Sequence, residues 1–307
     1  MSTFLQRHRA GLALAVVAAL LLPLAGFLVF GRDDDGPGPP PDGAEPGPDT
    51  ETLPLLGVAG EVPDRPALAV KVDDTDSGRP QATLADADIV VEEVVEGGLT
   101  RLIVVYHSQA PDRVGPVRSA RSTDIPLLAE LERPAFAWSG ANPTFAAAVR
   151  EADLIDVGAA AAPDAYQRSD DRRAPYNLYA SATDLWAAAE RTDEDAGPPP
   201  ALFTYGDGTG AGEAVGGFDT AGSPGLATDI RWDWDEGAGA WARTQDGTDH
   251  VDDDGTQVTA ANVVVRFTPY GDSGVRDSAG GVVPEAVSVG EGDAWLLRDG
   301  RLQRGRW

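Results

Sequence analysis

The chain has 307 residues, with 50 acidic and 24 basic side chains, a formal net charge of −26 and no cysteine. This charge excludes nucleic acid and anionic lipid surfaces as expected partners, because both repel an acidic protein. The absence of cysteine excludes disulfides, thiol chemistry, cysteine metal sites and anchoring through a lipidated cysteine. We expect no metal and no cofactor.

An uncharged run of 20 residues, GLALAVVAALLLPLAGFLVF, covers 11–30 and follows a start that carries Arg7 and Arg9. A helix needs ~20 apolar residues to span a bilayer, so we predict a transmembrane anchor over these residues. The basic flank places residues 1–10 in the cytoplasm and the rest of the chain outside. A cleaved secretory signal is the alternative, but its apolar region is shorter and ends at a small-residue cleavage site.

Residues 31–63 are rich in Pro, Gly and acidic side chains, a composition typical of a disordered tether. We therefore expect the folded region to begin near Asp64. The stretch TDEDAGPPP, residues 192–200, interrupts the later pattern and is a candidate domain boundary. The predicted parts are an N-terminal domain over 64–200 and a C-terminal domain over 201–307.

The first predicted domain alternates strand and helix patterns. Two β-rich runs flank Gly97-Gly98, and a glycine pair between such runs is a strong hairpin signal, because primed turns need positive φ. Other runs alternate along the chain in the way typical of a layered α/β or α+β domain. The predicted strands are 65–74, 89–96, 99–107, 135–140 and 154–158, and the predicted helices are 126–132, 143–152 and 181–191.

The second predicted domain consists of short apolar or aromatic runs between Gly and Asp clusters, which indicates β structure. These runs are ALFTYGD, DIRWDWD, GAWARTQ, TAANVVVRFTP and AWLLRDG. We therefore predict an α+β fold, with a mixed α/β N-terminal part built on a β-hairpin and flanking helices, a mostly β C-terminal part, and one transmembrane helix before them.

The predicted hairpin gathers charged residues. With a two-residue turn at Gly97-Gly98, Glu92, Glu96 and Arg101 lie on one face, with Arg101 diagonally between the two acids. The acids are then about 13 Å apart, too far to act together on one bond. A surface hairpin with ion pairs, each worth under ~1 kcal/mol, remains the alternative interpretation.

The segment GPVRSAR, residues 115–121, follows the second hairpin strand. If it begins a helix, Arg118 and Arg121 share a face, and such a pair suits bidentate capture of a carboxylate or phosphate. The pair could equally form a structural network with Glu92, Glu96 or Asp73. The spacing alone favours neither interpretation.

Other motifs lack what their chemistry requires. Residues 206–217 are glycine-rich but do not fit a dinucleotide or nucleotide loop. The start of HVDDDG resembles a calcium loop, but the twelfth position is Ala261 where glutamate is needed, so a hairpin turn is predicted. No nucleophile elbow accompanies His107 or His250, which argues against a serine hydrolase.

Several segments together resemble the YerB-like family of exported bacterial proteins, a domain of unknown function. They are RPALAVKVDD, GRPQATLADADIVVEEVVEGGLTRLIVVYHSQ, GPVRSAR, RRAPYNLYAS and HVDDDGTQVTAANVVV, in that order from about Arg65 to the end. The resemblance implies an extracytoplasmic, membrane-tethered protein with an α/β and a β-rich part, and no established reaction. The family's polar positions fall on Asp73, Arg79, Gln81, Asp88, Glu92, Glu96, Arg101, Arg118, Arg121 and Asn177.

Two features depart from the family pattern. Tyr176 stands where relatives usually have histidine, so an imidazole at this position is not essential here. The chain ends at GRW where relatives continue through further strands, so the last sheet is expected to be truncated.

The leading functional hypothesis is recognition of an anionic cell-envelope ligand, such as a wall glycan, peptide carboxylate or phosphate polymer. Arg101, Arg118 and Arg121 would bind it, oriented by Glu92, Glu96 and Asp73, with further ligand-binding candidates at Arg79, Gln81, Asp88 and Asn177. The alternative is a wall hydrolase or transferase in which the three acids perform acid–base catalysis. A third reading is a scaffold for wall-synthesis proteins, which would show an exposed apolar patch.

Overall fold

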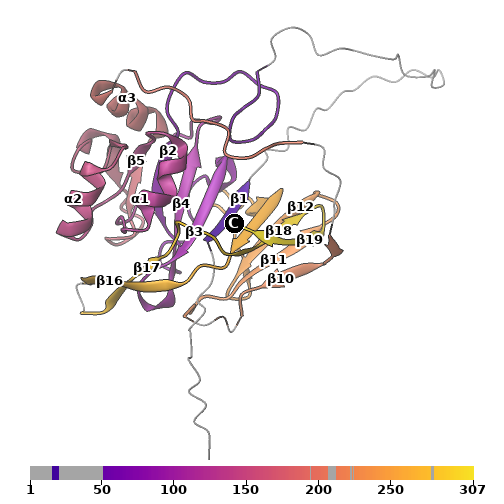
Figure 1. Cartoon of the computed structure of the whole chain (residues 1–307). Helices are drawn as coiled ribbons and strands as arrows, with labels where there is room; N and C mark the ends of the chain where they lie inside the picture. Colours follow the sequence, from indigo (N-terminus) through magenta and orange to yellow (C-terminus); the bar gives the residue numbers. More distant parts are fainter. Residues whose placement is uncertain are drawn as a thin grey trace, which may run out of the picture.

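A computed structural model describes the backbone of residues 16–20 and the residues 51–193, 195–206, 212–221, 223, 225–277 and 280–307. A ten-stranded sheet runs through both halves in the order β6-β5-β2-β4-β3-β1-β15-β18-β19-β9. The helices gather around its N-terminal half, and smaller β elements lie beside its C-terminal half (Figure 1). The structure thus confirms a mixed α/β N-terminal sheet with helices and a mostly β C-terminal part.

The N-terminal half is built on the buried strand β2, whose six residues LAVKVD are all inaccessible. It pairs antiparallel with β4 and parallel with β5, so both of its edges are hydrogen-bonded. Asn142 caps α2, and Ser181 caps α3. The strands are β2 (Leu68–Asp73), β3 (Ile89–Val94), β4 (Thr100–Tyr106), β5 (Ala135–Ala137), β6 (Ile155–Asp156), β7 (Tyr166–Arg168) and β8 (Leu178–Ala180), with α1 (Asp124–Leu128), α2 (Pro143–Glu151), α3 (Ala182–Thr192) and short 3₁₀ turns at Leu84–Asp86, Glu96–Gly98, Ala129–Leu131 and Pro163–Ala165.

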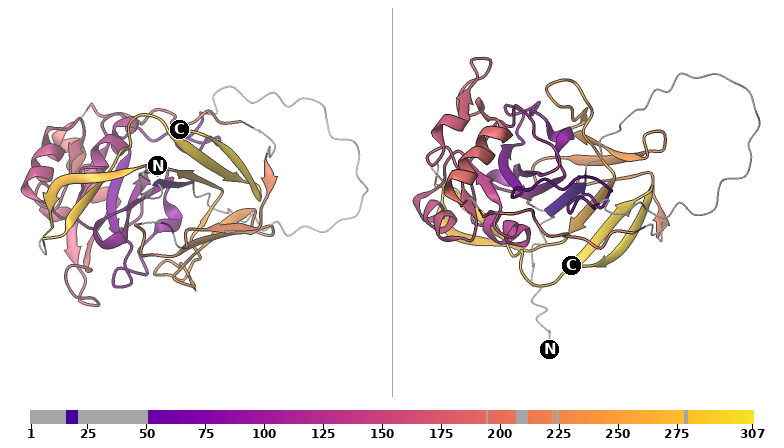
Figure 2. Two further views of the ribbon diagram at one scale, coloured as in Figure 1. Left: turned by 60° about the horizontal axis from the view of Figure 1, so that its bottom comes forward. Right: turned by 90° about the horizontal axis from the view of Figure 1, so that it is seen from above.

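The C-terminal half adds strands to the large sheet and forms a smaller sheet of β10 to β14. A separate hairpin, β16 with β17, reaches back to the N-terminal half, where β17 contacts β3 (Figure 2). The strands are β9 (Glu213–Ala214), β10 (Gly217–Asp219), β11 (Ile230–Asp235), β12 (Ala240–Gln245), β13 (Thr248–Asp249), β14 (Thr259–Ala260), β15 (Asn262–Arg266), β16 (Tyr270–Arg276), β17 (Val282–Ala286), β18 (Asp293–Arg298) and β19 (Arg301–Arg306).

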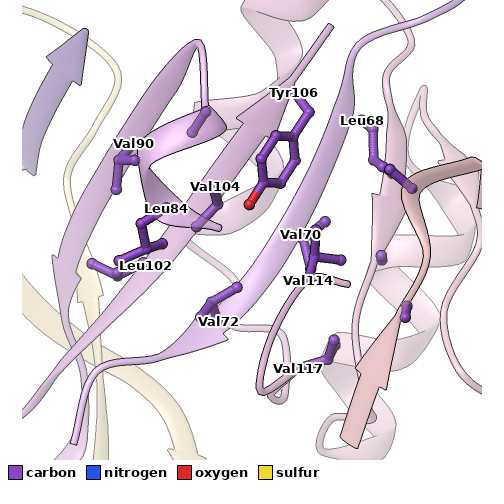
Figure 3. Close-up of a cluster of buried hydrophobic side chains, with 14 of the residues drawn as sticks. Leu68, Val70, Val72, Leu84, Val90, Leu102, Val104, Tyr106, Val114 and Val117 are labelled. Carbon is purple, nitrogen blue, oxygen red and sulfur yellow. The ribbon is translucent and has the colours of Figure 1, made fainter. Parts of the chain in front are cut away.

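Hydrophobic clusters cover both faces of the N-terminal half of the sheet. On one face, Val72, Val104 and Tyr106 belong to one cluster (Figure 3). The same cluster extends to Trp232 and Trp241 of the smaller sheet. The other face carries a second cluster, which continues into the helices. Each fully buried large side chain contributes about 1.5–3 kcal/mol, so this packing holds the two halves together.

Residues 16–20 do not form the expected helix. They form β1 (Val16–Leu20), which lies between β3 and β15 (Figure 1). The remainder of the predicted anchor over 11–30 lies outside the described residues. Among the helices that the structure describes, none is long and apolar enough to cross a membrane.

The folded region begins earlier than Asp64. The amide of Leu53 donates to the carbonyl of Val58 at 2.8 Å, and Leu55 is 1% exposed within the second hydrophobic cluster. The apolar side chains of this turn give it a place in the core, so the expected tether does not extend over 51–63. Its earlier part, 31–50, lies outside the described residues.

The hairpin of β3 and β4 is present, but its register differs from the prediction by one residue. Glu93 faces Arg101, whereas a two-residue turn would place Val94 there. The connection is longer than two residues, with a 3₁₀ turn over Glu96–Gly98. Because side chains alternate across a strand, the shift moves Glu92 to the opposite face.

Candidate functional site

Charged side chains meet at one end of a sheet face. Asp73 of β2 and Glu93 of β3 are both register partners of Arg101 on β4, and Lys71 lies two residues before Asp73. Directly paired residues point to the same side of a sheet, so these four share a face. With four residues from nearby segments they form what we call the charged cluster: Lys71, Asp73, Glu93, Glu96, Arg101, Arg118, Arg121 and Asp124.

The GPVRSAR segment enters the sheet as extended chain, so Arg118 and Arg121 do not share a helix face. The amide of Asp73 donates to the carbonyl of Pro116 at 3.0 Å, and the amide of Arg118 donates to the carbonyl of Lys71 at 2.8 Å. Val117 is fully buried in the hydrophobic cluster on one side. Alternation therefore places Arg118 on the charged side.

The two arginines of this segment each pair with an acid. Arg118 Nε lies 2.7 Å from Asp73 Oδ2, and the Asp73 side chain is fully buried. Arg121 Nη2 lies 2.8 Å from Glu96 Oε1, and both of these side chains remain slightly exposed. The structural-network interpretation therefore holds for Arg118 and Arg121.

Lys71 connects the strands to helix α1. Its ammonium donates to Glu93 and to Asp124 Oδ1, the latter at 2.7 Å, and all three side chains are buried. Burial raises the pKa of Glu93 to about 7, although Lys71 opposes that rise. The backbone amide of Arg121 donates to Asp124 Oδ2 at 2.7 Å, which ties the GPVRSAR segment to the same acid.

Arg101 differs from the other cations of the cluster. Among the described residues it forms no ion pair, and its guanidinium donates only to the carbonyl of Ser119, at 3.1 Å. Burial, together with repulsion from the neighbouring Arg121 and Arg118, lowers the pKa of Arg101 to about 10, and the nearby acids offset this only in part. The fold thus holds a partly exposed positive charge without a direct counter-ion.

Glu92 belongs to a different, closed group that joins the two halves. Arg243 of β12 places Nη2 3.0 Å from Glu92 Oε1 and 3.3 Å from Asp74 Oδ2, and all three are buried. Burial raises the pKa of Glu92 to about 7, with Arg243 opposing the rise. His250 contacts Gln81 at 2.7 Å, and burial beside Arg243 lowers its pKa to about 3.

The remaining predicted residues lie elsewhere. Asp88 accepts from the backbone amides of His107 and Ser108, where it fixes the end of β4. Arg79 pairs with Asp76 and Asp246, Asn177 accepts from Arg168, and Gln81 belongs to the closed group around Arg243. The structure brings together five of the ten predicted positions, namely Asp73, Glu96, Arg101, Arg118 and Arg121.

The sequence reasoning missed three members of the cluster and the central residue of the closed group. A lysine inside the apolar run of β2 was a usable signal for Lys71, because a buried ammonium needs acidic partners. Glu93 was hidden by the register error, and Asp124 by the expected helix boundary. No local signal indicated that Arg243 reaches Glu92 from a distant strand.

This arrangement favours anion binding over acid–base chemistry. The three predicted acids Asp73, Glu92 and Glu96 are each paired with an arginine, so none is a free proton donor or acceptor. Within the described part of the chain, no group of three His, Cys, Asp or Glu side chains is placed to hold a metal ion. Arg101 is the member of the cluster with donors to spare.

Comparisons with known proteins agree with the resemblance found in the sequence. The family described as "Protein of unknown function (DUF3048) N-terminal domain" matches residues 55–195, and its C-terminal domain matches 224–307. A protein of Bacillus subtilis (strain 168) named "Putative lipoprotein YerB" is 30% identical over 219 residues, 69% of this chain and 66% of the relative, slightly under two thirds of its length. The crystal structure of YerB from Bacillus subtilis matches with a TM-score of 0.70 at 25% identity, covering 84% of this chain and 87% of that one.

Proposed function

This chain belongs to the DUF3048 family, whose description states no function, and we propose that it is a membrane-attached extracytoplasmic protein that binds an anionic group of a cell-envelope ligand through Arg101. The name of its relative YerB as a lipoprotein supports the attachment. Because this chain has no cysteine to carry a lipid, its attachment would differ from that of a lipoprotein.

The uncompensated guanidinium of Arg101 carries the binding proposal. Its charged form is disfavoured by burial and by repulsion from Arg121 and Arg118. An incoming anion would relieve that repulsion, so the free energy of anion binding is more favourable at Arg101 than at an arginine that is already paired with an acid. An unpaired charge in a low-dielectric environment is also costly to keep, which argues for a role beyond structure.

A carboxylate or a phosphate is the ligand chemistry that fits. A guanidinium presents five donors in a planar fork, and Arg101 uses one of its groups for the Ser119 carbonyl. Arg118 and Arg121 add long-range attraction but have already committed donors to Asp73 and Glu96. In this arrangement Arg101 contacts the anion, whereas its neighbours position and attract it.

The protonation of Glu93 sets the charge of the cluster. With all groups ionised, four cations balance four acids, namely Asp73, Glu93, Glu96 and Asp124. Since the pKa of Glu93 is raised to about 7, protonation below that pH leaves an excess of one positive charge. Anion affinity should therefore increase as the pH falls through neutrality.

The acid–base alternative has weaker support. A hydrolase or transferase needs an acid that substrate can reach, but Asp73 and Glu92 are buried against arginines. Glu96 is accessible but bound to Arg121. Incubation with defined wall fragments that yields a new product would nevertheless favour this reading over binding alone.

The decisive experiment compares Arg101→Gln with a matched control. The full chain in detergent is titrated calorimetrically with inorganic phosphate and with an N-acetylated dipeptide that has a free carboxylate. Arg101→Gln should weaken binding at least tenfold, whereas Arg150→Gln, at an exposed arginine of α2, should leave it unchanged. Equal affinities of the two variants would show that Arg101 is not the anion site.

A further inference from the structure

A polar pocket lies beside the hairpin of β7 and β8, and we call it the hairpin pocket. It measures about 300 Å³, at the lower end of the ~300–1,000 Å³ range of small-molecule sites. Its lining comes from both strands of the hairpin and from Asp112 and Arg113, which lie beside β8 because Val114 pairs with Ala180. The hairpin pocket shares no lining residue with the charged cluster.

Tyr179 of β8 presents a hydroxyl to this pocket that the described part of the protein does not use. The residue lines the pocket and is 4% exposed. Its hydroxyl is neither enclosed nor hydrogen-bonded among the described residues, although the hydroxyl of a buried tyrosine normally has a partner. The ring is held in place by Arg113, whose guanidinium carbon lies 3.7 Å from the ring centre and which pairs with Asp253 of the HVDDDG segment. The hydroxyl is therefore fixed in position, and its hydrogen bonds are available to a ligand.

Two further side chains of the pocket have free polar groups. Gln167 of β7 is the register partner of Tyr179, so the two side chains share a face of the hairpin with their Cβ atoms about 5 Å apart. Neither the amide of Gln167 nor the carboxylate of Asp112 binds another described side chain or backbone group. The pocket thus combines an amide that donates and accepts, a hydroxyl that does both, and a carboxylate that only accepts.

The charges around the pocket balance each other. Asp112 and Asp171 lie opposite in sign to Arg113 and Arg168, in a chain whose net charge is −26. Each arginine already donates to a side chain of the protein. A phosphate or carboxylate would meet two acids, a cation would meet two arginines, and an apolar molecule would leave the polar groups without partners. The ligand that fits is uncharged and carries several groups that both donate and accept hydrogen bonds.

We propose that the hairpin pocket binds one sugar residue of a neutral glycan. Each sugar hydroxyl donates one hydrogen bond and accepts others, which matches the mixed groups of Tyr179, Gln167 and Asp112. Arg113 and Arg168 keep guanidinium donors for further hydroxyls. The site is separate from the anion site at Arg101 and does not depend on it, so either proposal can fail alone.

Ligand-observed NMR tests this proposal on the full chain, kept in a detergent that has no sugar headgroup. The probes are glucose, mannose, galactose and N-acetylglucosamine, and saturation transfer to each probe is titrated to give a dissociation constant. At least one probe should bind, and Tyr179→Phe should weaken its binding about fivefold, because one hydrogen bond of ordinary strength is lost. If none of the four sugars binds the unmodified chain, the proposal is refuted.

Two control measurements separate sugar binding from folding. Tyr179→Phe removes no hydrogen bond within the described protein, so its urea midpoint should equal that of the unmodified chain, and a lower midpoint would count against the pocket because it would give the hydroxyl a structural role. Gln167→Ala should weaken sugar binding by a similar factor, whereas Gln303→Ala, at an exposed glutamine of β19, should leave it unchanged. Equal sugar affinities of Tyr179→Phe, Gln167→Ala and the unmodified chain would place the sugar elsewhere and overturn the hairpin pocket.

Competition with phosphate distinguishes this pocket from the anion site. An excess of inorganic phosphate should leave the sugar affinity unchanged, because the charges of the pocket balance. Displacement of the sugar by phosphate, with the displacement lost in Tyr179→Phe, would show that the pocket takes anions and would overturn the proposed ligand class.

Discussion

Replacing Arg101 by glutamine should stabilise the folded chain while it removes anion binding. Burial and the two neighbouring arginines lower the pKa of Arg101 from the ordinary value of an arginine to about 10. Each pKa unit corresponds to about 1.4 kcal/mol, so the ionised side chain destabilises the fold by at most about 3.5 kcal/mol. Because the folded pKa is the lower one, this penalty is fully present below pH 10 and disappears only as the pH rises through the ordinary pKa of an arginine.

Two effects reduce the gain expected from the substitution. The side chain of Arg101 is partly exposed, so solvent screens part of the repulsion. The variant also weakens the hydrogen bond to Ser119, a loss of about 1 kcal/mol. The net expectation is a stabilisation of about 1–2 kcal/mol near pH 7.5, the size of effect seen when a strained functional site is relaxed.

Urea denaturation at low ionic strength is the suitable assay, because urea is uncharged and does not screen the cluster. Arg150→Gln provides the control and should change stability by less than about 0.5 kcal/mol. Phosphate at ten times its dissociation constant should stabilise the unmodified chain by about 1.4 kcal/mol and leave Arg101→Gln unaffected. A loss of more than about 1 kcal/mol in Arg101→Gln would refute the reasoning, because it would make Arg101 a structural residue.

Three other variants test the remaining geometry. Arg118→Ala leaves the fully buried carboxylate of Asp73 without its ion-pair partner and should cost about 3–5 kcal/mol in urea, and adding Asp73→Asn should recover part of that loss. The unfolded state ionises Glu92 near pH 4.5, whereas the folded state keeps the proton until about pH 7, so the free energy of unfolding should decrease as the pH rises from 4.5 to 7. The decrease should be smaller in Glu92→Gln. Identical urea midpoints of both proteins at pH 5 and pH 8 would contradict this. Phosphate affinity should rise severalfold as the pH falls from 8 to 6, because Glu93 takes up its proton in this range. Calorimetry on Glu93→Gln should show a weaker pH dependence of phosphate affinity. If the pH dependence is the same in Glu93→Gln, another group is responsible for it.

The sequence was a good guide to strands and a poor one to their connections. The glycine pair and the flanking β-rich runs predicted the hairpin of β3 and β4, and the short apolar runs predicted a β-rich C-terminal half. The register failed because Val95 donates its amide to the carbonyl of Leu99 at 2.8 Å, which lengthens the loop around the glycines. That bond depends on tertiary surroundings, so the glycine pair alone could not indicate it.

The charged cluster was predicted only in part, because its geometry also depends on tertiary contacts. Arg101, Arg118 and Arg121 do lie close together, as the hairpin and the GPVRSAR motif suggested. The segment is extended instead of helical because Val117 fills the core on one side while β2 takes its backbone bonds on the other. The pairing of Glu92 with Arg243, across 151 positions of the chain, depends on how the two halves pack, and no local pattern encodes it.

The burial of Lys71 has a chemical consequence for the whole molecule. It is the sole lysine among 307 residues, and its side chain is completely enclosed. The folded protein therefore offers its surroundings no ε-amino group, so it cannot accept an acyl group in the manner of lysine-linked envelope polymers. Amine-directed reagents should therefore leave Lys71 unmodified as long as the protein is folded.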